Sequence, residues 1–319
     1  MLYRRHLRIK VLQALYAWYT TDSDNLTQGE KQLFLSINKL YELFIFQLSY
    51  LVEIKRFAIE RIEENKHKFY PTDDDLNPSM KFVENKVNRM IEDNRDFQRK
   101  EQAFKVRWGE EKEMVRKSYK HLIKFDFFKT YLSNNKSSLD EDKKLYLKIV
   151  DKLLPNDDLL KSYYEEKSVY FVDGYDLVLI LLIKFFDTLT EDFNPDSPMP
   201  GLYKSADQLK NEDVDFVKTL YKKVILNDKE LTSILESKTS TWDYDRIPIM
   251  DIILLKMAII ELKEIETVPV KVTLNEYIEM TKYFSTEKSK TFVNGVLDRL
   301  IREFKDEGKI RKIGRGLIE

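Results

Sequence analysis

The chain has 319 residues, 43% hydrophobic and 34% charged, with a formal net charge of −1. A near-neutral chain is not the basic body of a general nucleic-acid-binding protein, so any such role depends on a local basic patch. Cysteine is absent, which excludes disulfide bonds, thiolate catalysis and thiolate metal sites and is typical of a cytoplasmic protein. The chain has only eight glycines and eight prolines, which favours long helices with few tight turns.

The first predicted helix covers residues 4–19, where apolar side chains recur at helical spacing. Arg4, Arg5 and Arg8 lie at its start, where the positive end of the helix dipole disfavours an exposed cation by about 0.3–1 kcal/mol each. At about 100° per residue the three arginines share one face. Two interpretations stay open: a binding site for phosphate groups, or a solvated basic start of the chain.

A second, longer helical pattern covers 29–66 and ends at the turn-forming stretch 70–80. Within that stretch, Asn77 and Pro78 predict the N-cap and first residue of a further helix. Charged amphipathic helices are expected to fill 79–152.

The longest apolar run, Leu177–Ile183, has seven residues, whereas a helix that spans a bilayer needs about 20. A buried helix is therefore expected there, and no contact with a membrane. The proline-rich stretch 192–201 predicts a linker. Beyond it, 212–238 predicts one or two helices, and 246–262, apolar almost all round, predicts a central buried helix.

Two features mark the last part of the chain. Thr273 is predicted to cap a helix, because Glu276 three residues later completes a capping box. Gly295 lies inside a helical pattern, where glycine costs about 1 kcal/mol relative to alanine. Such a glycine indicates close approach of the backbone either to another helix or to a ligand, and both interpretations stay open. The fold class predicted for the whole chain is all-α.

Aromatic and basic side chains alternate around residues 282–292. Rings stack on unpaired bases for about 1–3 kcal/mol each, and ammonium groups bind phosphates, so this pattern suits single-stranded RNA. Alternatively, the rings face the core and the lysines are merely solvated. The residues concerned are Lys282, Tyr283, Phe284, Lys288, Lys290 and Phe292.

Motifs of catalysis are missing from the sequence. It contains no glycine-rich phosphate loop, no GxSxG elbow and no HExxH pair. Its three histidines, His6, His67 and His121, are far apart and have no ligand spacing. We therefore expect a protein that is not an enzyme and holds neither a metal nor a cofactor.

Three stretches resemble the NusB family of transcription antitermination factors. They are RRHLRIKVLQALYAW at 4–18, DRIPIMDIILLKMAIIEL at 245–262 and VPVKVTLNEYIEMTKYFSTEKSKTFVNGVLDRL at 268–300, the last being the most specific. The resemblance implies an all-α, NusB-like bundle of two packed subdomains. It also implies binding of boxA-type single-stranded RNA of ribosomal RNA transcripts, together with the ribosomal protein NusE, in an elongation complex with RNA polymerase.

The resemblance also implies site residues. The RNA-binding residues carried over are Arg4, Arg5, Arg8, Lys271, Lys282, Phe284, Lys288, Phe292 and Asn294. The positions carried over for NusE are Tyr16, Asp245 and Asp251. Within these sets the arginines would bind phosphates, the phenylalanines would stack on bases, and the acidic residues would suit a basic ribosomal protein.

The chain departs from the family in length, because family members are typically less than half as long. The expected organisation is an RNA-facing first helix at 1–20, a helical insertion at 21–205 contiguous with the N-terminal subdomain, a helical core at 206–305 and a basic, flexible tail at 306–319. The resemblance does not give the role of the insertion.

Two other functions stay open. The chain could be a helical protein–protein adaptor whose insertion carries the main function. It could also be the RNA-binding portion of an RNA methyltransferase, although no GxGxxG-like strand–turn–helix follows the helical part. A homodimer is equally open.

Overall fold

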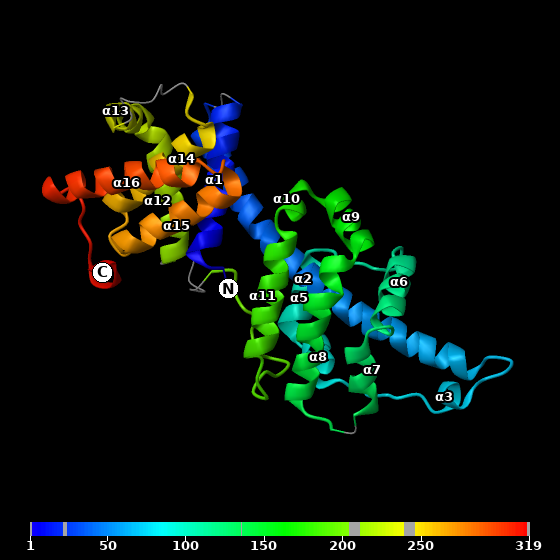
Figure 1. Cartoon of the computed structure of the whole chain (residues 1–319). Coiled ribbons are helices and arrows are strands. Elements are labelled where there is room, and N and C mark those ends of the chain that lie inside the picture. The colour runs from blue at the N-terminus through cyan, green and yellow to red at the C-terminus, as the bar shows by residue number, and fades with distance from the viewer. Residues whose placement is uncertain (1, 22–23, 135, 204–210, 239–245, 318–319) are drawn as a thin grey trace. The chain divides into compact units, whose positions relative to one another are not determined.

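The computed structural model describes residues 2–21, 24–134, 136–203, 211–238 and 246–317 (Figure 1). Within these ranges every regular element is a helix, which confirms the all-α prediction. No helix in them is both long and apolar enough to cross a bilayer.

The chain divides into two compact units. Unit 1 comprises residues 38–202, and unit 2 comprises residues 2–37 together with 203–319. The long helix α2 (Leu26–Lys66), which agrees with the pattern predicted at 29–66, contributes residues to both.

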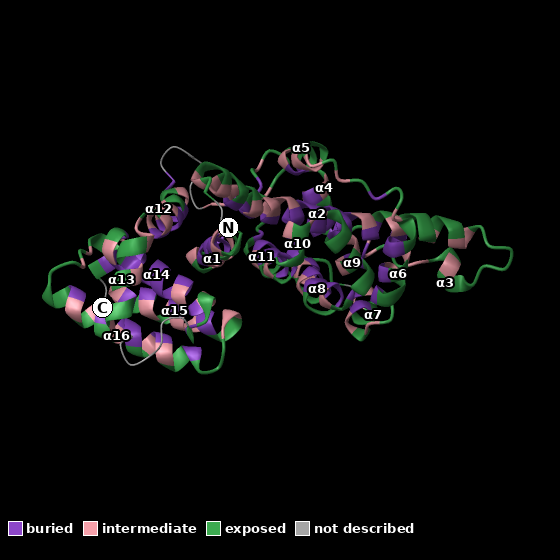
Figure 2. Cartoon of the chain, turned by 90° about the horizontal axis from the view of Figure 1, so that it is seen from above, coloured by how far each residue is buried: buried purple, intermediate pink, exposed green. Residues whose placement is uncertain are grey.

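Unit 2 is arranged around one central helix. Its helices are α1 (Arg4–Thr20), α12 (Glu212–Leu226), α13 (Asp228–Lys238), α14 (Ile249–Glu264), α15 (Val270–Phe284) and α16 (Ser289–Asp306). Helix α14 packs against the other five and is buried without interruption from Ile253 to Leu262 (Figure 2). The prediction of a central buried helix is therefore confirmed.

Unit 1 surrounds the middle of α2, whose residues Leu43–Phe46 are all fully buried. Its other helices are α3 (Asp73–Leu76), α4 (Lys86–Glu92), α5 (Arg95–Ala103), α6 (Lys112–Leu122), α7 (Asp126–Ser133), α8 (Leu139–Lys152), α9 (Asp158–Lys167), α10 (Val169–Val172) and α11 (Tyr175–Thr188). Many begin at a side chain that accepts a bond from a free N–H of the first turn, as Asn85, Asn94, Ser138 and Asp157 do.

The predicted helix start at Asn77 and Pro78 is wrong. Thr72 and Asp75 exchange the two bonds of a capping box and so start the short helix α3, of which Asn77 is the C-cap. The next helix, α4, begins only at Lys86, where Asn85 accepts a hydrogen bond from a first-turn N–H.

The predicted capping box at Thr273 is also wrong. Helix α15 begins three residues earlier, at Val270, directly after Pro269, whose fixed φ suits a helix start. Thr273 therefore lies inside the helix, fully buried, and its hydroxyl donates to the carboxylate of Glu261 at 2.8 Å. Glu276 binds Arg5 instead of a backbone N–H.

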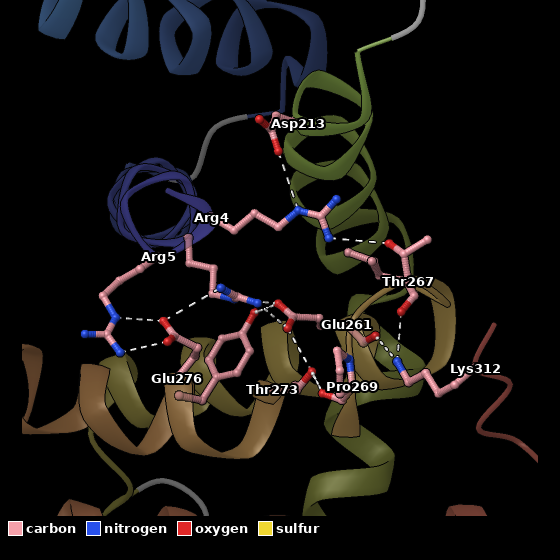
Figure 3. Close-up of polar contacts among 12 residues, drawn as sticks. Arg4, Arg5, Asp213, Glu261, Thr267, Pro269, Thr273, Glu276 and Lys312 are labelled. Carbon is pink, nitrogen blue, oxygen red and sulfur yellow. Dashed lines mark hydrogen bonds and ion pairs between the residues drawn. The ribbon is translucent and has the colours of Figure 1, made fainter. Parts of the chain in front are cut away.

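A buried ion pair joins α1 to the centre of unit 2. The guanidinium of Arg8, a residue that is 2% exposed, donates from Nε and Nη2 to the two carboxylate oxygens of Glu261 at 2.8 and 2.6 Å. Glu261 is 0% exposed and also accepts from the hydroxyls of Thr273 and Tyr277 at 2.8 and 3.1 Å (Figure 3). Helices α1, α14 and α15 thus meet at one carboxylate.

Arg8 stays charged in this pair. Burial alone would lower the pKa of Arg8, but the adjacent carboxylate of Glu261 more than offsets it, so that the pKa lies above its usual value. A buried charge is tolerated only when it is paired and hydrogen-bonded, and four donor groups satisfy this carboxylate. The pair therefore fixes where α1 can lie on α14.

Residues 309–317, part of the expected basic tail, pack against the end of α14. The Nζ of Lys312 donates to the carbonyl oxygens of Glu261 and Ile265 at 3.2 and 2.8 Å, and its burial lowers the pKa to about 8. The N–H of Ile313 donates to the carbonyl of Glu266. These bonds attach the segment to the last turn of α14 and to the residues that follow it.

Glu261→Gln is expected to destabilise the protein by about 3–5 kcal/mol, because it removes the carboxylate charge that binds the buried Arg8 and leaves only the more distant Glu276, 3.7 Å away. Urea unfolding measures the change. Glu279→Gln, which removes an exposed carboxylate paired with Lys282, should leave the free energy of unfolding nearly unchanged. A loss below about 1 kcal/mol for Glu261→Gln would contradict the assigned role of the pair.

Gly316→Ala is expected to detach the C-terminal segment, because a Cβ there would lie 1.9 Å from the carbonyl oxygen of Glu266. Hydrogen exchange at the amide of Ile313, which is bonded to that carbonyl, should then become fast. In the control Gly295→Ala, whose Cβ meets nothing within 4 Å, protection of this amide should be unchanged.

Candidate nucleic-acid interface

The arginines at the start of α1 bind carboxylates of unit 2. Arg5, whose side chain is 50% exposed, donates from Nε and Nη2 to Glu276 at 2.8 and 2.7 Å (Figure 3). Arg4 contacts Asp213 and Glu212 of α12 at 3.5 and 3.3 Å. These carboxylates offset the unfavourable position of the cations at the positive end of the helix.

The expectation that Arg8 offers its guanidinium to phosphates is not met in this structure. Its side chain is buried, and Glu261 occupies two of its donor groups while Glu276 lies 3.7 Å from a third nitrogen. The helical spacing correctly places the three arginines near one face of α1, and in the structure that face lies against carboxylates of the same unit. Arg5 alone of the three keeps half of its side chain accessible.

A group of basic residues surrounds Glu279 on α15. The pKa of Glu279 is lowered first by its hydrogen bond from Lys282, and further by the charges of Arg5 and Lys290. Cations from α1, α15 and α16 therefore lie around one exposed carboxylate. This is the part of the predicted site that the structure does bring together across long distances in sequence.

A groove of about 400 Å³ lies along one side of α16. Its lining residues are Lys238, Lys288, Thr291, Phe292, Gly295, Val296 and Arg299. Three of them are cations, and one of these, Lys238, pairs with Glu303. The groove thus combines an aromatic ring with positive charge, the combination that binds single-stranded nucleic acids.

Gly295 opens the groove. A Cβ built at this position would meet nothing within 4 Å, so close packing of another described helix does not account for the glycine. Close approach to another helix is thus not seen among the described residues, and approach to a ligand stays a proposal. Phe292 and Arg299 lie three and four residues away along α16, on the same side of the helix.

The other RNA-binding candidates differ in exposure. Phe284 and Phe292 are both partly exposed, so neither ring is locked in the core. Lys271 is exposed in the first turn of α15. Asn294 is half-buried, and its amide donates to Asp298 at 3.4 Å.

The candidates for a protein partner differ in exposure. Tyr16, near the end of α1, is 41% exposed. Asp251 is 1% exposed, in the first turn of α14, where the helix dipole favours its charge, so the expectation that it lies at a partner surface is wrong. Asp245 lies outside the described residues.

Sequence reasoning missed three residues of this surface: Lys238, Glu276 as the partner of Arg5, and Arg299. Arg299 follows Phe292 by seven residues, so helical spacing alone could have found it. Lys238 belongs to a different helix, and nothing in its local sequence links it to the groove. Within the described ranges there is no group of three or more side chains suited to hold a metal ion.

Residues 187–302 match the model of the NusB family. The transcription antitermination protein NusB of Salinibacter ruber is 41% identical over 104 residues, which are 33% of this chain and 65% of that protein. The proteins of the same name from Chloroherpeton thalassium and Clostridium botulinum are each 38% identical, over 33% and 31% of this chain and 50% and 70% of their own lengths. No solved structure matches the chain.

The extent of these matches corrects one expectation. The chain covers 65% and 50% of the first two relatives, and the family match does not reach the first helix. The additional residues therefore lie N-terminal to the matched region, not between two matched parts. Identity of 38% over 70% of the relative from Clostridium botulinum is far above what unrelated sequences share. The chain belongs to the NusB family.

Proposed function

We propose that the chain is a non-catalytic transcription antitermination factor that binds boxA-type single-stranded RNA of ribosomal RNA transcripts. The observation that carries this proposal is the groove along α16, where Phe292 lies beside the open position of Gly295 among three cations. The relatives bear the name of transcription antitermination proteins, which agrees with it.

In this proposal an unpaired base stacks on the ring of Phe292. The absence of a Cβ at Gly295 lets the base approach the backbone of α16, which repays the weaker helix propensity of glycine. Lys288 and Arg299 at the edges of the groove neutralise the adjoining phosphates. Stacking is worth about 1–3 kcal/mol per base, so one ring contributes substantially to affinity.

Arg5 supplies a second phosphate contact. Its two bonds to Glu276 use Nε and Nη2, hold the guanidinium in one orientation and leave Nη1 to an RNA phosphate. Arg4 and Arg8 act indirectly, because their carboxylate partners hold α1 in place. The residues that extend the surface are Lys271, Lys282, Phe284 and Asn294.

NusE is the proposed protein partner, within an elongation complex with RNA polymerase. Tyr16 offers an exposed ring on α1 whose hydroxyl can bond across an interface. Asp245, which lies outside the described residues, stays a proposed contact for the same partner.

An RNA titration tests the groove and the arginine separately. Phe292→Ala should weaken binding of boxA-type RNA roughly 5- to 150-fold with an unchanged salt slope, because stacking releases no counterions. Arg5→Glu should weaken binding of all RNA sequences and reduce the log–log salt slope by about 0.7. Tyr70→Ala and Arg311→Glu are the matched controls, since both remove exposed groups elsewhere. Unchanged affinity in Phe292→Ala would contradict the proposal.

Co-purification tests the protein partner. Tyr16→Ala should lower the affinity for NusE at least tenfold and leave the affinity for RNA unchanged. The reason is that an aromatic side chain at the centre of an interface typically contributes about 2 kcal/mol or more. Leu35→Ala, which trims another exposed apolar side chain, is the control. If Tyr16→Ala still bound NusE with the affinity of the parent protein, the surface around Tyr16 would not be the NusE-binding site.

A further inference from the structure

A second basic and aromatic surface lies on unit 1, in residues that the family match does not reach. It is formed by the C-terminal half of α6, the turn to α7 and the exposed side of α8. We call it the α6–α8 surface; its members are Lys117, Lys120, His121, Lys124, Phe125, Phe127, Lys144 and Lys148.

Three rings of this surface form a continuous stack. His121 and Phe125 have ring centroids 4.9 Å apart and planes inclined by 25°. Phe125 and Phe127 have centroids 5.0 Å apart and planes inclined by 26°. His121 is exposed at one end of the stack, whereas Phe128, the next residue in the chain, is buried in the core.

The turn between the two helices creates this stack. The N–H of Lys124 donates to the carbonyl of His121, and the N–H of Phe125 donates to that of Leu122, which closes α6 within two residues. Phe125 then serves as the N-cap residue of α7 without a side-chain bond. A side chain at an N-cap ordinarily accepts a hydrogen bond, so the ring is present here for another reason than capping.

Among the described residues, Glu113 acts on two lysines of this surface without pairing with them: the hydrogen bond from Arg116 lowers the pKa of Glu113 first, and the charges of Lys117 and Lys120 lower it further. No ion pair within 4 Å involves Lys117, Lys120, Lys124, Lys144 or Lys148 in the described part of unit 1, whereas neighbouring cations are paired, as Arg116 is with Glu113 and Lys129 with Asp126. The negative end of α6 stabilises cations in its last turn. That effect accounts for Lys120, but not for Lys117 in the middle of the helix or for the two lysines on α8.

We propose that the α6–α8 surface is a second binding site for single-stranded RNA. One base stacks on the exposed face of His121 and extends the row of rings, and the lysines on either side neutralise the flanking phosphates. At the other end of the row, Lys148 already lies over the ring of Phe127 at 5.9 Å, so that end is covered by a cation. An acidic protein would match the lysines but would leave the stacked rings without a role. The choice of RNA over single-stranded DNA rests on the proposed function.

The test uses the full chain carrying Phe292→Ala, so that the groove on α16 contributes little, and an oligouridylate of about 12 nucleotides. The variant Lys117→Glu, Lys120→Glu, Lys124→Glu is compared with the control Arg61→Glu, Lys66→Glu, Lys68→Glu, which makes the same charge change on unit 1. The first should reduce the log–log salt slope by about 2 and the affinity at least tenfold. The control should stay within about twofold of the parent, since its cations are already paired.

His121→Ala tests the stack, and it should lower the affinity about fivefold or more without changing the salt slope. If the two charge variants bound the oligouridylate with the same affinity and the same salt slope, the inference would be overturned. It would also be overturned if His121→Ala had no effect, because the surface would then bind polyanions such as an acidic protein. Tighter binding of the matching oligodeoxynucleotide would exclude RNA as the ligand.

A separate titration with boxA-type RNA distinguishes this inference from the proposed function. If Phe292→Ala weakens that RNA while the α6 charge variant leaves the oligouridylate unaffected, only the inference fails. If the α6 variant weakens the oligouridylate while Phe292→Ala leaves boxA-type RNA unaffected, the proposed function fails and the second site stands.

Discussion

The buried pair of Arg8 and Glu261 determines much of unit 2. One carboxylate receives the guanidinium of α1 and the hydroxyls of Thr273 and Tyr277 from α15, so three helices have a common point of attachment. Apolar contacts alone would let helices slide by small amounts, whereas hydrogen bonds to a buried charge have one acceptable geometry. The backbone carbonyl of the same residue also binds Lys312, so the C-terminal segment depends on that position too.

This arrangement divides the basic residues of unit 2 by role. Those that meet carboxylates in the interior, as Arg8 does, hold the helices together. Those at the rim, as Arg5 does, share their donor groups between a carboxylate and the solvent. The three cations of the α16 groove line an open space next to an aromatic ring. A net charge near zero is thus compatible with the proposed RNA binding, because cations can be concentrated at one surface while carboxylates elsewhere in the chain balance them.

Periodicity predicted the elements whose sequence carries a strong pattern: α1, the long helix α2 and the apolar helix α14. Periodicity did not predict the burial or the hydrogen-bond partners of residues whose contacts are distant in sequence. Arg8 is buried because Glu261, 253 residues away, lies opposite it, and nothing near Arg8 indicates this. Thr273 has the right neighbour for a cap, but Pro269 starts the helix earlier.

In the site, Phe292 and Lys288 were predicted from local pattern and lie in one groove, whereas Lys238 joins them only through the packing of α13. Unit 1 offered no familiar motif, and its ring stack depends on a turn geometry that sequence alone does not specify.

At Gly295, helix stability and the proposed binding of a ligand favour different residues. The helix around it would gain about 1 kcal/mol from alanine, and the open space beside it would admit the methyl group without a clash. A laboratory evolution campaign scored only by heat resistance would therefore be expected to replace this glycine early. The resulting variants would keep their fold and have a higher melting temperature. The added methyl group would make the groove along α16 shallower. Thermostability screens of such proteins thus need a binding readout at every round.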